Sequence, residues 1–372
     1  MSRIASLFTG TLVILFCSPT SSSVIANEQP SPQVLAYYNS WRDAYLTISD
    51  RVEGGALIDY QNNRTTCSEA LGYGMLATVY FAGENESQAK ADFKALNRFR
   101  KAFPSNVDGR LMAWRIEDDS DVPVETACAT DGDLDIAFAL LLAGQKWDDS
   151  NLLSEGLALV TAIRETLVRD DFSLRRGDWD VTQHAVRLSD VMPTHFRLFG
   201  TVDDADFWNA VEQMHYEIIE ETMGQHGAFP DFVIFSDDSW QPAPPNFLES
   251  PHDGEFYYNA CRVPWRLAAA ALEHDCENAR SILATFGGGI GKVENHDFKA
   301  GYQHDGSPVN TWTDGAFTAP HLVSLMVNDR SPEMRSAFAA HLTARENYYA
   351  DSIRLFCLEL CDRFSNRSEK KD

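Results

Sequence analysis

The chain has 372 residues, of which 44% are hydrophobic, and it carries a formal charge of −24 at neutral pH. This length and hydrophobic content are typical of a soluble globular protein with a large core. A surface this acidic repels nucleic acids and anionic membranes, so we expect neither as a partner. It would attract a cationic polymer, although its simpler role is to keep the protein in solution.

The N-terminus has the pattern of a secretory signal peptide. Arg3 provides a positive charge, and the apolar run that follows, Ile4–Phe16, is too short to span a bilayer. A polar stretch then leads to small residues that favour cleavage after Ala26. We therefore predict a signal peptide at 1–26, a secreted or periplasmic protein, and a single domain over 27–372.

Apolar residues at helical spacing dominate the remainder, and no convincing strand alternation interrupts them. The run from Ile136 to Ala143 is wholly apolar, which predicts a helix buried on all sides. The longest loop is expected at 224–258. The fold class is therefore all-α, and the paired helices suit either an α-solenoid or a closed ring of hairpins. The predicted helices are 34–48, 69–81, 87–103, 133–147, 152–168, 205–223, 263–274, 277–286, 320–327, 332–342 and 352–361.

Two short segments each place a carboxylate at the start of an apolar helix: Cys67–Met75, which contains Glu69, and Ala129–Ala137, which contains Asp131. Together they resemble the signature segments of glycoside hydrolase family 8, bacterial enzymes that hydrolyse β-1,4-linked polysaccharides. The resemblance extends over about residues 37–325. It implies an (α/α)6 barrel, and hydrolysis that needs no cofactor or metal.

Glu69 matches the family's general acid in a Ser-Glu-Gly-x-x-Tyr-Gly-Met segment, although Ala70 replaces the glycine. The alternative is that Glu69 only stabilises the helix dipole from the first turn. A general acid must be protonated at the working pH. We therefore expect burial or a neighbouring carboxylate to raise the pKa of Glu69.

Asp131 is the residue that the resemblance identifies as gripping and distorting the sugar at the cleavage site. Asp131, Asp133 and Asp135 form an acidic cluster, which also suggests a calcium-binding loop. Such a loop needs Gly and Glu where Ile136 and Leu142 stand. Helix capping is the expected role of Asp133 or Asp135.

The base is predicted from a third segment that resembles the family, 257–266. One branch of the family has an Asp base where this chain has Asn259, and an amide cannot accept the proton. Another branch has Asn there and takes its base from a Glu on the preceding loop, which Glu249 matches. Asp253 and Glu255 are the alternatives. With Glu69 as acid and Glu249 as base, the mechanism inverts the anomeric centre, and roughly 6.5–9.5 Å is expected between the carboxyl groups.

Sugar-binding positions complete the predicted site. Trp114 matches a family subsite tryptophan, since aromatic rings stack on pyranose faces. Tyr258 and Arg262 match positions that line the cleavage subsite, and Asn259 lies between them. The remaining candidates are Tyr73, an aromatic residue near a loop, and His195, for which a purely structural role is equally open.

Six cysteines remain after signal cleavage, and export would allow them to oxidise. If the predicted site residues converge, the thiols beside them in the sequence come close, which suggests a Cys67–Cys128 disulfide. The scattered spacing of the cysteines does not resemble a zinc site.

The sequence thus predicts a secreted, inverting endo-glycosidase, monomeric, acting on a β-1,4-linked polysaccharide. β-Glucan is favoured, chitosan is the second candidate and xylan the third. A carbohydrate-binding barrel without activity is the alternative that Ala70 and Asn259 would favour. An accessory role in exopolysaccharide assembly also stays open.

Overall fold

The computed structural model describes residues 29–119, 125–293, 297–328 and 332–369. The predicted signal peptide lies outside these residues. One hydrophobic cluster extends through the described chain from Val34 near its start to Phe364 near its end.

Twelve α-helices form the framework of the described chain. Eleven of them correspond to predicted helices. Their bounds are α1 Pro32–Tyr45, α2 Ser68–Tyr80, α3 Glu86–Ala102, α4 Thr130–Trp147, α5 Ser150–Leu167, α6 Pro193–Val202, α7 Ala205–Thr222, α8 Val263–His274, α9 Glu277–Gly288, α10 Gly315–Asn328, α11 Pro332–Thr343 and α12 Tyr348–Glu369.

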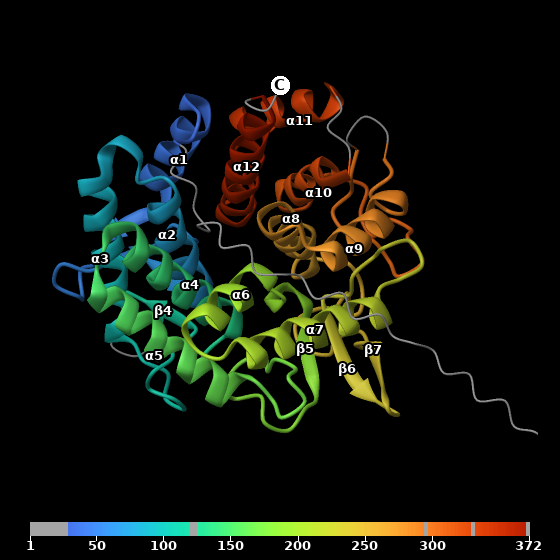
Figure 1. The fold of residues 1–372 in the computed structure, drawn as a ribbon, viewed down its shortest axis with the longest axis horizontal. Coiled ribbons are helices and arrows are strands. Elements are labelled where there is room, and N and C mark those ends of the chain that lie inside the picture. The colour runs from blue at the N-terminus through green and yellow to red at the C-terminus, as the bar shows by residue number, and fades with distance from the viewer. Residues whose placement is uncertain (1–28, 120–124, 294–296, 329–331, 370–372) are drawn as a thin grey trace, which may run out of the picture.

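The helices form two concentric rings (Figure 1). The even-numbered helices contact one another in the order α2, α4, α6, α8, α10 and α12, and α12 returns to α2, so the inner ring is closed. The odd-numbered helices pack outside it, each against an inner neighbour. This closure confirms the (α/α)6 barrel and excludes the α-solenoid.

Close packing of α2 against α4 fixes the inner ring where the two signature segments meet. A Cβ on Gly132 would lie 2.2 Å from Ser68 Oγ, and one on Gly72 would lie 2.7 Å from the Cβ of Asp135. Only glycine allows these backbones to approach so closely. The segment from Ile136 to Ala143 is buried on all sides, as predicted.

Seven short strands in the loops of the described chain correct the prediction that strands are lacking. They pair antiparallel in three small sheets, β1 with β2, β3 with β4, and β5 with β6 and β7. Each has only three to five residues, too few to show alternation. The strands are β1 Leu46–Ile48, β2 Ala56–Ile58, β3 Thr65–Cys67, β4 Arg115–Glu117, β5 Ala185–Arg187, β6 Phe232–Ser236 and β7 Ser239–Pro242.

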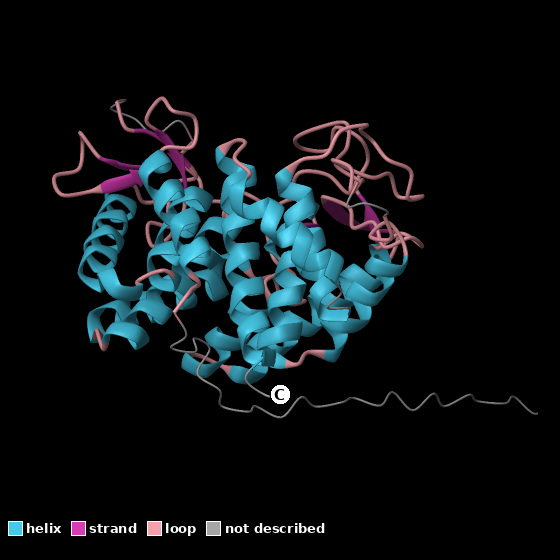
Figure 2. Cartoon of the chain, turned by 90° about the horizontal axis from the view of Figure 1, so that it is seen from above, coloured by secondary structure: helices cyan, strands magenta, loops and turns pink. Residues whose placement is uncertain are grey.

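Figure 2 shows the strands and long loops gathered at one end of the barrel, which we call the loop face, whereas short turns connect the helices at the other end. Helices α2 and α4 begin at this face. In the described part of the chain, no helix is long and apolar enough to cross a membrane.

The predicted disulfide is wrong. All six cysteines of the described chain are free, buried thiols. Cys128 instead accepts a hydrogen bond from the backbone N–H of Asp178, at 3.3 Å. Burial raises the pKa of both Cys67 and Cys128, which keeps the thiols protonated and unreactive.

Candidate active site

The two signature carboxylates meet at the loop face because their helices run parallel in the inner ring. Glu69 lies in the first turn of α2 and Asp131 in the first turn of α4. Arg262 ends a short 3₁₀ helix, η3 (Ala260–Arg262), directly before α8. Helix N-termini carry partial positive charge, so this end of the barrel suits a cluster of acidic side chains.

Arg262 joins the components of the site. Its Nη1 donates to Glu69 Oε2 at 2.5 Å and to Asp131 Oδ2 at 3.0 Å. Its Nη2 donates to Ser189 Oγ at 2.8 Å and to Asn259 Oδ1 at 3.1 Å. The guanidinium is almost wholly buried. Because its planar fork makes four bonds at once, it fixes Glu69 and Asp131 relative to the third segment.

Glu69 has the electrostatics that a general acid needs. Only 14% of its side chain is exposed. Burial raises its pKa to about 7; Arg262 opposes this rise, while Asp131 and Asp135 add to it. The carboxyl group can therefore hold a proton near neutral pH, as the sequence analysis required.

Asp131 is held in the opposite protonation state. Burial pushes its pKa upward, but the nearby cations Arg187 and Arg262 outweigh burial, so the pKa falls below its ordinary value. Its Oδ1 also accepts the backbone N–H of Gly132 at 2.9 Å. The two adjacent carboxyl groups therefore differ in pKa, so that Glu69 can hold a proton near neutral pH while Asp131 is charged.

Glu249 belongs to the same hydrogen-bonded group. Its Oε2 accepts from Asn259 Nδ2 at 2.9 Å, and Asn259 in turn accepts from Arg262. A continuous line of bonds therefore runs from Glu249 through Asn259 and Arg262 to Glu69. Glu249 itself is exposed to solvent, where it can meet a water molecule.

Asn259 is fixed from below by Asp231, a buried residue that the sequence analysis missed. Asp231 accepts the backbone N–H groups of Tyr257 at 2.9 Å, Asn259 at 3.0 Å and Ala260 at 2.7 Å. Burial raises the pKa of Asp231 to about 7, although these amides lower it. This carboxyl group shapes the turn that carries Asn259 and Arg262.

The two alternative bases are already engaged. Asp253 is buried, and its oxygens accept four hydrogen bonds from residues 248–250. Glu255 pairs with His252 Nδ1 at 2.6 Å. Of the three acidic residues weighed as base, only Glu249 is both exposed and joined to Glu69.

The family follows from comparison with known proteins. The sequence matches the family Glycosyl hydrolases family 8 over residues 8–362. The chain belongs to glycoside hydrolase family 8. It is therefore a glycoside hydrolase, and the reading as a carbohydrate-binding barrel without activity is set aside.

Similar proteins in this family include the β-glucanase of Niallia circulans, 36% identical over 87% of this chain and 83% of that protein. An endoglucanase of Bacillus sp. (strain KSM-330) is 29% identical over 90% of this chain and 76% of its own. Among solved structures, the β-1,3-1,4-glucanase of Paenibacillus sp. X4 superposes with a TM-score of 0.83 at 34% identity, covering 89% of this chain and 91% of that one.

The aromatic residues predicted for the site differ in how deeply they are buried. Trp114 is half-buried and accepts the N–H of Ser68, beside Glu69, through its carbonyl at 2.9 Å. Tyr258 is also half-buried, and its hydroxyl donates to Asp314 Oδ2 at 3.0 Å. Both side chains thus keep part of their surface exposed.

His195 and Tyr73 lie beneath the site, which corrects their prediction as sugar contacts. Tyr73 is fully buried between Trp265 and Phe356. His195 stacks on Phe138 with 3.8 Å between ring centroids, and burial lowers its pKa to about 4. In this conformation neither side chain can reach a saccharide.

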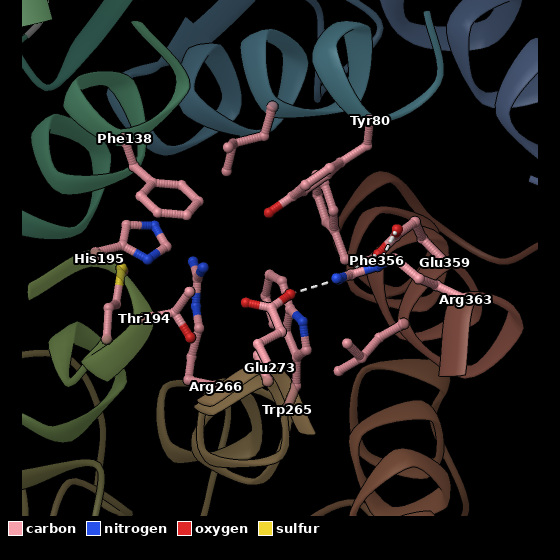
Figure 3. A pocket seen from close by; sticks show the side chains of 14 residues that line it. Tyr80, Phe138, Thr194, His195, Trp265, Arg266, Glu273, Phe356, Glu359 and Arg363 are labelled. Carbon is pink, nitrogen blue, oxygen red and sulfur yellow. Dashed lines mark hydrogen bonds and ion pairs between the residues drawn. The ribbon is translucent and has the colours of Figure 1, made fainter. Parts of the chain in front are cut away.

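The layer below the site surrounds a cavity of about 30 Å³. Figure 3 shows His195 facing Phe138, with Arg266 extending into the same space. Asp135 accepts from His195 Nε2 at 2.8 Å and from Arg266 Nη2 at 2.7 Å. His195 thus has the structural role that the sequence analysis left open.

The acidic cluster of α4 does not cap its helix, contrary to prediction. No side chain caps α4. Asp133 Oδ1 instead accepts the backbone N–H of Met112 at 3.1 Å, and Asp135 reaches into the barrel as described above. Among the described residues, no three His, Cys, Asp or Glu side chains are placed to hold a metal ion.

Arg187 and Asp190 are further buried residues that the sequence analysis did not single out. Arg187 Nε lies 3.3 Å from Asp190 Oδ1, and its Nη1 lies 3.8 Å from Asp131 Oδ2. The only sequence signal was position, because both lie shortly before the candidate His195 in the chain.

Proposed function

We propose that this protein is an inverting endo-β-glucanase in which Glu69 protonates the departing oxygen and Glu249 activates water on the opposite face of the sugar ring. Asp131, held ionised, grips the sugar at the cleavage site. In one displacement the water oxygen bonds to the anomeric carbon as the glycosidic bond breaks. One proton passes from Glu69 to the leaving group, and one passes from water to Glu249.

The observation that carries this proposal is the line of hydrogen bonds between Glu249 and Glu69. Two acidic residues separated by 180 positions enter one rigid group, with Asn259 and Arg262 between their carboxylates. One is buried, with its pKa raised to about 7, and the other is exposed. This asymmetry suits an acid and a base that share a substrate.

β-Glucan is the proposed substrate because the relatives at 36% and 34% identity are called β-glucanase and β-1,3-1,4-glucanase. Rim aromatics support an extended binding surface for a polymer, since 42% of Trp179 and 54% of Trp312 is exposed. We further propose that the protein is exported to the periplasm or medium and acts as a monomer.

Chitosan remains the second candidate, because the strong negative charge of the chain would attract a polycationic polymer. Reducing-end release from soluble mixed-linkage β-glucan, carboxymethyl cellulose, chitosan and xylan ranks the substrates. Preference for chitosan or xylan over both glucans would refute the β-glucan assignment.

The mechanism is tested with Glu249→Gln and Glu69→Gln, each an isosteric change that removes one proton-transfer group. Each should lower kcat by about 10²–10⁴-fold, the range that general acid–base catalysis contributes. Proton NMR of the wild-type reaction should show the α-anomer of the new reducing end first. Initial release of the β-anomer would refute inversion, and an active Glu249→Gln variant would refute the choice of base.

A further inference from the structure

The loop that carries Glu249 has little hydrophobic support. Glu249 is exposed, and its neighbour Leu248 has 43% of its surface exposed. Asn246 adopts a φ of 60°, and its N–H bonds to the carbonyl of Ser250 at 2.8 Å, which closes a tight turn. A reacting carboxylate on such a turn needs polar anchors to hold its position.

Asp253 provides them from below. It is 0% exposed. Its Oδ2 accepts the backbone N–H groups of Leu248 at 2.6 Å and Glu249 at 3.0 Å. Its Oδ1 accepts the N–H of Ser250 at 2.9 Å and the hydroxyl of Ser250 at 3.2 Å. Three consecutive amides of the turn, at 248–250, thus meet one buried carboxylate, and hydrogen bonds to a charged group are the stronger kind.

The start of β6 links this anchor to the remainder of the site. The carbonyl of Asp253 accepts the N–H of Phe232, which is fully buried, at 2.8 Å. The residue before it, Asp231, fixes the turn of Asn259, whose side chain holds the carboxylate of Glu249. One strand end therefore supports Glu249 twice, through its backbone and through its side chain.

We propose that Asp253 is a positioning residue for catalysis, because it holds the backbone of Glu249 where the carboxylate meets the attacking water. This inference rests on the proposed function, in which Glu249 is the base. Asp253 touches no substrate, so its loss should slow the chemical step and leave substrate binding largely intact.

Asp253→Asn tests this directly, because an amide places an N–H₂ donor against backbone donors. We expect kcat on mixed-linkage β-glucan to fall by about 100-fold, the scale of a 1 Å misplacement of a reacting group, with KM within about twofold of wild type. The matched control is Asp305→Asn. The exposed Asp305 bonds the N–H of Ser307 at 2.9 Å and its hydroxyl at 2.6 Å in another loop, and its loss should leave kcat unchanged.

The outcomes separate the two proposals. An inactive Glu249→Gln variant together with a near-wild-type kcat for Asp253→Asn would overturn the positioning role alone. A raised KM at unchanged kcat would also overturn it, because Asp253 would then serve binding. An active Glu249→Gln variant would instead overturn the proposed function.

Circular dichroism and thermal unfolding establish whether Asp253→Asn folds. If it does not, Ser250→Ala decides the question, because it removes the hydroxyl contact with Asp253, together with the bond that this hydroxyl accepts from the N–H of His252 at 3.0 Å. The proposal then requires a fall in kcat of about fivefold, the scale of one hydrogen bond, at unchanged KM. An unchanged kcat in a folded Ser250→Ala protein would refute it.

Discussion

Replacing Glu69 by Gln should inactivate the enzyme and yet stabilise its fold at alkaline pH. Glutamine resembles the protonated acid in shape but never ionises. Burial raises the pKa of Glu69 from 4.5 to about 7, so folding favours the protonated form. The wild-type protein must therefore bury a charge above pH 7, whereas the variant never does.

The magnitude follows from the two pKa values. Each pH unit between them corresponds to about 1.4 kcal/mol, so the charged form costs the fold about 3 kcal/mol. The contribution of the protonated Glu69 to the free energy of folding is fully present below pH 4.5, where Glu69 is protonated in both the folded and the unfolded state. It is lost progressively as the pH rises to 7. Arg262 keeps Asp131 as a charged partner in the variant, which limits the cost of removing the Glu69 charge.

Thermal unfolding at pH 5 and pH 9 measures this effect. A chain of this size unfolds with an entropy of roughly 0.75 kcal/mol per degree, so about 3 kcal/mol corresponds to a Tm difference of about 4 °C. The Tm of Glu69→Gln relative to wild type should therefore be about 4 °C higher at pH 9 than at pH 5.

Glu69→Ala is the control, since it removes the charge but also leaves a cavity and removes the acceptor of the hydrogen bond from Arg262. Its Tm should be below that of Glu69→Gln at both pH values. Equal Tm differences for Glu69→Gln at pH 5 and pH 9 would refute the buried-charge argument. So would a Glu69→Gln variant that is less stable than wild type at pH 9.

Three more predictions concern the same site. In the wild-type enzyme, kcat/KM should fall tenfold per pH unit above about pH 7, where Glu69 ionises, as a pH–rate profile would show. Arg262→Lys keeps the charge but not the fork, so kcat should fall by about 100-fold in steady-state assays while the protein remains folded by circular dichroism. Gly132→Ala places a methyl group 2.5 Å from the carbonyl carbon of Ser68; overpacking of about 1–3 kcal/mol should lower the Tm by roughly 1–4 °C.

Helices could be predicted from the sequence wherever a long apolar face or run marks them. The bounds of α8 agree at both ends, and the apolar run in α4 is buried as expected. The helix that was missed, α6, has only ten residues and starts at Pro193, shortly after a 3₁₀ turn that ends at Asp190. Its sequence pattern is too short to separate from the surrounding loop.

Closure of the ring could not be read from periodicity, because each helical hairpin has the same pattern in a solenoid and in a barrel. Only the contact of α12 with α2 distinguishes the two. The resemblance to the family supplied that information instead, through residues at the start of α2 and α4.

The positions of Glu69 and Asp131 at helix N-termini could be predicted from the sequence, but the buried anchors below them could not. Asp231 and Asp253 are two among 55 acidic residues, and their sequence surroundings resemble those of solvated loop acids. Their roles come from backbone amides that only the folded loops bring together. Conversely, Tyr73 has a site-like position in the sequence, but it lies one helical turn further along α2 than Glu69, where it is buried in the core.

The asparagine at position 259 is more than the absence of a base, because its amide is matched to its surroundings. Nδ2 donates to Glu249 at 2.9 Å and lies 3.4 Å from Asp231, while Oδ1 accepts from Arg262 at 3.1 Å. An aspartate here would place a third carboxylate against two others and remove the donor that holds Glu249. Like charges this close disfavour ionisation. A base at 259 and a base at 249 are therefore mutually exclusive in this arrangement.

Asn259→Asp should consequently lower kcat by about 100-fold, because it displaces Glu249 without replacing it. In the double variant with Glu249→Gln, one of the competing carboxylates is gone, and the carboxyl group introduced at position 259 is free to ionise. This double variant should exceed Glu249→Gln alone in kcat on mixed-linkage β-glucan. A single Asn259→Asp variant with wild-type kcat would show that the amide bonds do not hold Glu249 in its working position.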